Sequence, residues 1–277
     1  MSLRWSRRLK IFLAPQQVSL MEVSGILRKR VARKQVVPVG QVPGVPQWQS
    51  AVTALASTLS DGNWHAGTAD FVVSGHFARY TLIPWSDQLA GQQERQAFLR
   101  HCFHLAYGEP SRQWDLHMSP PVPGASSLAS GISLSLLQSL QAVSAKAGIR
   151  VADIYPALMA GVYQARRALR RGPAWFCIRE PGRLDLALLE DGNWQSLSSH
   201  ELDTEEPAAF SALLETLMAR ESALLGKRDQ GWPVVLYWPG KVFAPGIFPR
   251  KVIPVAKPRM DGVRPDEAAF FQILAGV

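Results

Sequence analysis

Apolar and polar positions follow the periods of strands and helices in turn along the first part of the chain. Residues 9–37 contain three apolar runs separated by turn signals, which predicts an antiparallel meander of three strands. Beyond it, apolar residues at helical spacing alternate with short apolar runs bounded by glycine, proline or serine. The predicted elements are helices over 49–59, 88–107, 133–147 and 157–171 and strands over 69–75, 79–85, 112–118 and 149–155.

The same order of elements begins again after Gly172 and Pro173. The second part predicts strands over 174–180, 183–190, 194–199, 234–238 and 251–255 and helices over 208–225 and 265–275. No sequence repeat is visible, but the order repeats, which predicts an α/β protein built as a duplicated βββαβαβ unit. This is the organisation of actin-like (ribonuclease-H-like) folds, with two lobes around a cleft. We expect the first lobe over 1–171, with a small insert subdomain at about 83–125, and the second over 172–277.

The charge of the chain is concentrated at one end. Lysine and arginine number 30 against 22 aspartates and glutamates, which gives a formal net charge of +8. Residues 1–40 hold nine basic side chains against Glu22 alone, which is also +8, so the rest of the chain carries no net charge. Such a patch fits an acidic partner or anionic lipid better than a nucleic acid, whose binders spread positive charge over a docking face. It also fits a solvent-exposed sheet edge, because charges occupy both faces of the third strand.

The composition excludes several classes of protein. Hydrophobic residues make up 47% of the chain and charged residues 19%, which is typical of globular proteins. The two cysteines, Cys102 and Cys177, stand in no motif spacing, which argues against a disulfide framework and against a zinc site. No secretory signal and no membrane-spanning stretch is evident, so we expect a soluble cytoplasmic protein without a metal site.

The two meander turns are where a nucleotide-binding member of this fold class grips phosphate. Each turn needs an aspartate that holds Mg²⁺ through water and a glycine that lets backbone N–H groups approach phosphate oxygens. The first turn, FLAPQQVSL, has Phe12 or Leu13 in place of the acid and Ala14 in place of the glycine. The second, CIREPGRLDL, has Ile178 and Glu180 at these places. Each turn also contains a proline, which removes a donor, so we expect no ATP or magnesium as cofactor.

Two other features could belong to a nucleotide site. The strand VVLYW is followed by Gly240 and Gly246, where actin-like proteins close on adenosine, although a strand that leaves a sheet through a turn needs glycine as well. Asp185, in the strand after the second turn, is the one acid that we can name for catalysis. Walker, dinucleotide-binding, HExxH and GxSxG motifs are all missing from the sequence.

Several segments, taken in order, resemble one known group of proteins. They are FVVSGHFARYTLIPW, WDLHMSPP, AGIRVADIYPALMAGVYQARRAL, AWFCIREPGRLDLALLEDGNWQSL and VIPVAKPRMDGVRPDEAAFFQILAGV. Together they resemble the PilM proteins of type IV pilus assembly and the cytoplasmic part of the related GspL proteins of type II secretion. The likeness covers nearly the whole chain. The last helix resembles the one that ends PilM proteins, so we expect a complete protein.

This resemblance implies a cytoplasmic protein associated peripherally with the bacterial inner membrane. PilM proteins bind the short cytoplasmic tail of a membrane protein, PilN, in a groove beside the insert subdomain. They also carry the aspartate and glycine phosphate turns, from which this sequence departs, so it is closer to the nucleotide-free GspL type. For contact with a PilN-like partner or an anionic membrane surface, the candidates are Arg28, Arg30, Arg79 and Trp85. We expect no nucleic acid as partner.

The sequence therefore favours a non-enzymatic scaffold of a pilus or secretion complex. Two alternatives stay open. One is an ATP-binding enzyme of the ATPase or kinase type, with Asp185 as its acid. The other is a lipid or nucleic-acid binder that works through the basic residues 1–40.

Overall fold

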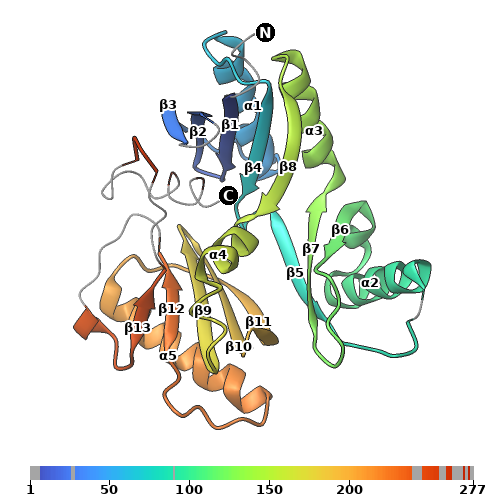
Figure 1. Ribbon diagram of the computed structural model, residues 1–277, viewed down its shortest axis with the longest axis vertical. Helices are drawn as coiled ribbons and strands as arrows, with labels where there is room; N and C mark the ends of the chain where they lie inside the picture. Colours follow the sequence, from blue (N-terminus) through green and yellow to red (C-terminus); the bar gives the residue numbers. More distant parts are fainter. Residues whose placement is uncertain are drawn as a thin grey trace.

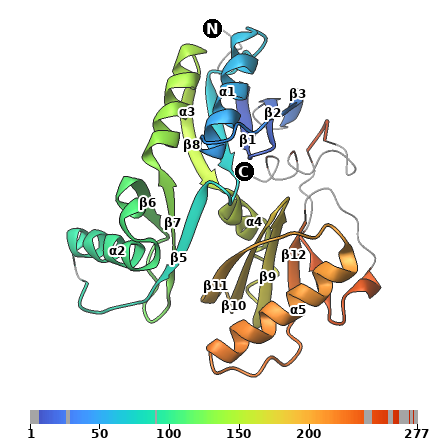
Figure 2. The same ribbon diagram turned by 180° about the vertical axis from the view of Figure 1, so that it is seen from behind.

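The computed structural model of the chain describes residues 7–25, 29–89, 91–238, 245–255, 260–263, 271 and 274. Figure 1 shows two lobes, each built on a five-stranded sheet, and a smaller three-stranded sheet attached to the first lobe. Figure 2 shows the same arrangement from behind, with helix α5 (Pro207–Leu224) lying across the second sheet.

The first sheet grows from the predicted meander. Its strand order is β3-β2-β1-β4-β8, with β1 to β3 antiparallel and β4 and β8 parallel to β1. Helices α1 and α3 pack against each other beside this sheet, and β3 forms one edge, as its charges predict. The elements are β1 (Arg7–Leu13), β2 (Gln17–Ser24), β3 (Arg30–Pro38), α1 (Gln47–Ser60), β4 (Thr68–Val73), α3 (Leu134–Lys146) and β8 (Arg150–Pro156).

The second sheet repeats this plan. Its order is β11-β10-β9-β12-β13, so the predicted duplication is confirmed at the level of strand order. One difference is that the described residues between the last two strands form only a 3-10 turn, η3 (Pro245–Ile247), in place of a helix. The strands are β9 (Pro173–Glu180), β10 (Arg183–Glu190), β11 (Asn193–Glu201), β12 (Val234–Tyr237) and β13 (Val252–Pro254).

The small sheet, in the order β5-β7-β6, lies between β4 and α3 in the sequence. It runs from Ala78 to Ser133 and so extends beyond the predicted insert range of 83–125 at both ends. Ser126, directly before the last strand of this sheet, bridges to Trp194 in β11, so the small subdomain also contacts the second lobe. Its elements are β5 (Ala78–Ile83), α2 (Gln92–Tyr107), η2 (Glu109–Gln113), β6 (Trp114–Met118) and β7 (Ser127–Ser133).

Strand β7 is missing from the sequence prediction because SLASGIS is rich in small residues with weak strand preference. It becomes a strand by pairing with β5 on one side and β6 on the other. A side chain at Gly131 would place its Cβ 2.9 Å from Leu116 and 3.0 Å from Phe103 and Trp114, so the packing of the insert requires glycine there.

Helix α4 (Ala157–Ala165) connects the lobes and ends earlier than the predicted helix over 157–171. Four arginines follow within the next six residues, 166–171. In a continued helix they would form like-charge pairs four residues apart, which destabilise helices. Instead, the N–H groups of Ala168 and Leu169 both donate to the carbonyl of Ala165 in a tight turn.

Residues late in the chain return to the first lobe. The Asp261 carbonyl accepts a hydrogen bond from the Val31 N–H at 2.9 Å, and the Leu274 carbonyl accepts one from the buried ammonium of Lys10 at 2.9 Å. Phe271 and Leu274 are helical and share a core cluster with the first sheet. Phe271 and Leu274 fall within the range 172–277 that the sequence analysis gives to the second lobe. In the structure they pack on the first lobe, because their apolar side chains are buried in its core. The rest of the predicted helix over 265–275 lies outside the described residues.

Candidate functional site

The two meander turns lie beside one small cavity between the lobes. The sequence predicts that these turns face each other, and both line this cavity. Its volume is about 130 Å³, whereas pockets for drug-sized ligands measure roughly 300–1,000 Å³. The lining residues are Ala14, Pro15, Gln16, Gln17, Gln41, Gln47, Ser74, His76, Glu180, Pro181 and Gly182.

In the first turn, backbone polar groups are hydrogen-bonded to other residues of the protein. Phe12, at the expected place of the acid, is fully buried in the core. The N–H of the buried Ala14 donates to the Gln17 carbonyl at 3.0 Å. The side-chain amide of Gln41 donates to the Pro15 carbonyl. The backbone N–H that a phosphate clamp would present at Ala14 is therefore already bonded.

In the second turn, Glu180 reaches across to the first lobe. Its Oε1 accepts a hydrogen bond at 2.8 Å from the N–H of Gly75, which lies between β4 and β5. Ile178, two residues earlier, is buried in the core. Burial raises the pKa of Glu180 to about 7, although the hydrogen bond from Gly75 acts in the opposite direction. Glu180 thus bonds the first lobe at the place where the sequence analysis expects the glycine of a phosphate turn.

His76 adds a second bond between the lobes. Its Nε2 lies 2.9 Å from the carbonyl oxygen of Pro181, and because a carbonyl only accepts, Nε2 carries the proton. Burial lowers the pKa of His76, which keeps the imidazole neutral at neutral pH. Gly182 follows with φ +73°, a left-handed conformation that glycine adopts without strain.

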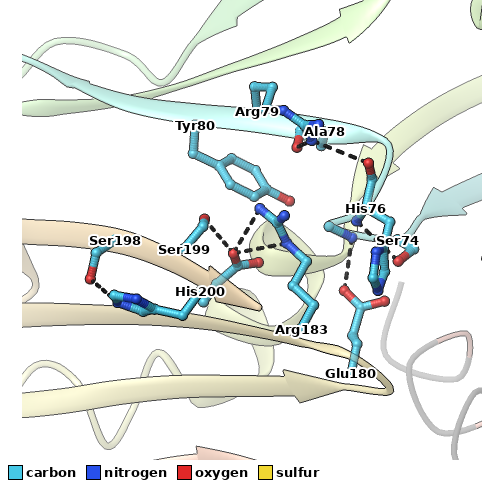
Figure 3. A network of polar contacts seen from close by, with 12 residues as sticks. Ser74, His76, Ala78, Arg79, Tyr80, Glu180, Arg183, Ser198, Ser199 and His200 are labelled. Carbon is cyan, nitrogen blue, oxygen red and sulfur yellow. Dashed lines mark hydrogen bonds and ion pairs between the residues drawn. The ribbon is translucent and has the colours of Figure 1, made fainter. Parts of the chain in front are cut away.

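Asp185 lies in β10 and comes close to Gly75 in the turn between β4 and β5 of the first lobe. Its Oδ1 accepts hydrogen bonds from Ser199 Oγ at 2.5 Å and from Arg183 Nε at 3.2 Å. A Cβ at Gly75 would lie 2.7 Å from Arg183 Nε and 2.8 Å from Asp185 Oδ2, so only glycine allows this approach. Figure 3 shows the ring of Tyr80, from β5, above the guanidinium of Arg183.

Together these contacts form one interlobe network, defined as Ser74, Gly75 and His76 of the first lobe with Glu180, Pro181, Arg183, Asp185 and Ser199 of the second. Asp185, the candidate catalytic acid, is 1% exposed and already engaged by Arg183 and Ser199. The bonds of this network that cross between the lobes join the second meander turn to the turn between β4 and β5.

The other predicted site residues do not meet at one place. Arg79 lines a cavity of about 250 Å³ beside the N-terminus of α1, while the indole N–H of Trp85 donates to Asp87 in a separate hollow of about 40 Å³. Arg30 is exposed at the start of β3 and bridges to Asp261. Gly246 lies in η3 with open space around it. Arg28 and Gly240 lie outside the described residues.

A larger groove, of about 520 Å³, lies between the small sheet and the first lobe. We call it the insert groove. One wall is the outer edge of β8, whose partner among the described strands is β4 alone, so the backbone groups of that edge remain available to a further strand. The opposite wall is formed by β6 and β7. The side chains that define it include Asp115, His117, Ser130, Ile132, Leu137, Asp153 and Met159.

The chemistry of the insert groove combines acidic and apolar groups. Asp115 and Asp153 are its carboxylates, and Asp115 Oδ2 lies 2.9 Å from Nε2 of the exposed His117. Ile132, Leu137 and Met159 contribute apolar surface. An extended segment with basic and apolar side chains is complementary to such a groove.

Within the described part of the chain, no cluster of three or more His, Cys, Asp or Glu side chains is placed to hold a metal ion. Among the helices that the structure describes, none is both long and apolar enough to cross a lipid bilayer.

Comparison with solved structures identifies the fold. The chain aligns with a Bacteroides thetaiotaomicron VPI-5482 protein of actin-like ATPase fold and unknown function, with a TM-score of 0.62, 10% identity and coverage of 99% of this chain and 97% of that one. It also aligns with the cytoplasmic domain of EpsL, an inner-membrane component of the Vibrio cholerae type II secretion system, with a TM-score of 0.58, 10% identity and coverage of 97% and 93%.

The chain has an actin-like fold, as its element order predicts. A third alignment is with a PilM–PilN type IV pilus biogenesis complex, with a TM-score of 0.54, 16% identity and coverage of 79% of this chain and 69% of that one. No protein-family model matches the sequence, and no curated protein matches it.

Sequence reasoning missed two parts of this site. His76 carries no local signal, because its partner, the Pro181 carbonyl, is 105 residues away. The residues of the insert groove also carry no local signal, because two of its walls, β7 and the outer edge of β8, are formed only by strand pairing.

Proposed function

We propose that this protein is a non-enzymatic scaffold of a type IV pilus or type II secretion inner-membrane complex. The observation that carries the proposal is the interlobe network, in which Glu180 and His76 bond the two lobes where an ATPase of this fold holds phosphate. The likeness in fold to a PilM–PilN complex and to the EpsL cytoplasmic domain supports the choice of system.

The scaffold would act by holding the cytoplasmic tail of an inner-membrane protein in the insert groove. The tail would add as an extended strand to the free edge of β8, with its basic side chains toward Asp115 and Asp153. Through this partner the protein would sit at the cytoplasmic face of the membrane. The basic edge at β3 would contribute less to binding of the partner or the membrane. Its Arg33 and Lys34 already donate hydrogen bonds to the carbonyls of Asn63 and Gly262.

Filling the insert groove is expected to abolish tail binding. Ser130 lies in the central strand of the small sheet and lines the groove, so Ser130→Trp would occupy it. The measurement is fluorescence anisotropy with a labelled extended peptide of basic and apolar residues, the chemistry that complements the groove. We expect affinity to fall by at least about tenfold.

Ser60→Trp provides the matched control, because it places the same new side chain at an exposed position at the end of α1. This control should bind the peptide as the unchanged protein does. Equal binding by Ser130→Trp and Ser60→Trp would show that the tail binds elsewhere and would contradict the groove assignment.

Mg-ATP is expected to leave the melting temperature unchanged. A ligand that binds the folded state at about 100 times its Kd stabilises by about 2.7 kcal/mol, which for a chain of this size raises Tm by roughly 5–10 °C. The closed network leaves about 130 Å³ between the turns, so we expect a shift below about 1 °C at millimolar ATP. A reproducible rise of several degrees would instead support the ATP-binding enzyme.

A further inference from the structure

Arg79 is a half-buried cation without a carboxylate partner among the residues that the structure describes. Its Nη1 donates to the carbonyls of His76 at 3.1 Å and Ala78 at 2.9 Å. These are neutral acceptors, so the positive charge is not compensated by them. Burial lowers the pKa of Arg79 and the charge of Arg183 acts in the same direction, while the charge of Asp185, which is itself paired with Arg183, acts against them.

The guanidinium borders a cavity of about 250 Å³. This cavity and the insert groove lie on opposite faces of the small sheet, because alternate residues of a strand point to opposite faces. Trp114 and Gly131 line the cavity, whereas Asp115 and Ser130 line the groove. The two spaces are therefore separate sites.

The sheet is built so that Arg79 remains accessible from this cavity. Gly131 stands opposite Arg79 in the β5–β7 register, and packing against Leu116 and Trp114 requires glycine there. No side chain from the neighbouring strand therefore covers the guanidinium at that position.

The remaining walls provide aromatic surface and polar groups. Trp48, Phe77 and Trp114 are the aromatic residues, and Gln47 and Ser133 supply an amide and a hydroxyl. No aspartate or glutamate is among the described residues that line the cavity. The site thus combines a cation that has no carboxylate partner within the cavity with faces on which a planar group can stack.

We propose that this cavity binds a small aromatic carboxylate or aryl phosphate. The anionic group would pair with the fork of the Arg79 guanidinium, which matches both kinds of oxygen anion, and the ring would lie against Trp48 and Trp114. The volume accommodates a ligand of roughly ten to fifteen non-hydrogen atoms. This proposal does not depend on the scaffold function, because the cavity is neither the insert groove nor the interlobe network.

Isothermal titration with benzoate, phenyl phosphate and the neutral benzamide tests the proposal on the full chain. We expect at least one anion to bind with a Kd below about 1 mM and benzamide to bind at least about tenfold more weakly. The two anions distinguish a carboxylate site from a phosphate site. If neither binds at about 10 mM, or if benzamide binds as well as both, the proposal is wrong.

Variants locate the binding. Arg79→Gln is expected to lower the affinity for the preferred anion by at least about tenfold. Arg79→Lys keeps the charge but loses the two parallel donors of the guanidinium, so it should lower the affinity by less. Arg112→Gln removes an exposed arginine of the same subdomain, paired with Glu109, and should change nothing. Circular dichroism checks that each variant is folded. Undiminished binding by a folded Arg79→Gln would remove Arg79 from the site and overturn the proposal.

Discussion

Replacing Asp185 by alanine is expected to lower the free energy of unfolding by about 3–5 kcal/mol. The side chains of Asp185 and Arg183 are 1% and 13% exposed, and Nη2 of Arg183 lies 3.1 Å from Oδ1 of Asp185. Removing the carboxylate leaves a largely buried guanidinium without its ion-pair partner and takes the acceptor from Ser199. Urea denaturation followed by circular dichroism and by tryptophan fluorescence measures the loss.

A carboxylate of the same strand provides the control. Glu190 is the last residue of β10 and pairs with Lys227 at 2.7 Å, with the two side chains 46% and 33% exposed. Glu190→Ala should therefore cost at most about 1 kcal/mol. If Asp185→Ala is as stable as Glu190→Ala, the buried pair does not stabilise the fold. A stable Asp185→Ala protein that has lost a measured ATPase activity would instead support the enzyme alternative.

Replacing Glu180 by glutamine is expected to stabilise the protein at alkaline pH. The pKa of Glu180 is about 7 in the folded protein and near 4.5 when the carboxyl is free in solution. The folded state therefore binds more protons between these values, so this group's contribution to stability falls as pH rises from about 4.5 through 7. Fully ionised, Glu180 destabilises the folded state by about 3 kcal/mol, and the glutamine variant avoids this while its amide oxygen still accepts from Gly75.

The test is the difference in unfolding free energy between Glu180→Gln and the unchanged protein at pH 5, 6, 7 and 8. The difference should be smallest at pH 5 and grow toward pH 8. The pKa of His76 is lowered by burial, so its contribution to stability is lost as pH falls, but it is present in both proteins and cancels. Parallel stability curves for the two proteins would show that Glu180 does not titrate in this range.

The duplicated sheet could be predicted because its signals are local. β9, β10 and β11 are apolar runs separated by Pro181-Gly182 and Asp191-Gly192, and the structure has turns at both places. By contrast, β7 owes its strand conformation to two neighbouring strands, and SLASGIS alone has no strand signal.

The candidate site could be predicted only in part. The sequence alone shows that both turns differ from the phosphate-turn pattern, at Phe12, Ala14, Ile178 and Glu180. The hydrogen bond that Glu180 makes could not be predicted, because its partner Gly75 lies 105 residues away in a turn without a sequence motif. Arg79 and Trp85 line separate hollows of the small sheet, and only pairing and packing separate them.

The bond from Lys10 to Leu274 joins residues 264 positions apart. A ribosome adds residues from the N-terminus at about 5–20 per second, so the first sheet emerges well before the residues that cover it. Until Leu274 has left the exit tunnel, the ammonium of Lys10 lacks this acceptor and the apolar surface beneath Phe271 and Leu274 stays open to water. A chaperone therefore has the most apolar surface to protect while the first lobe is made but residues 271–274 are not, because these late residues complete the core of the lobe that is synthesised first.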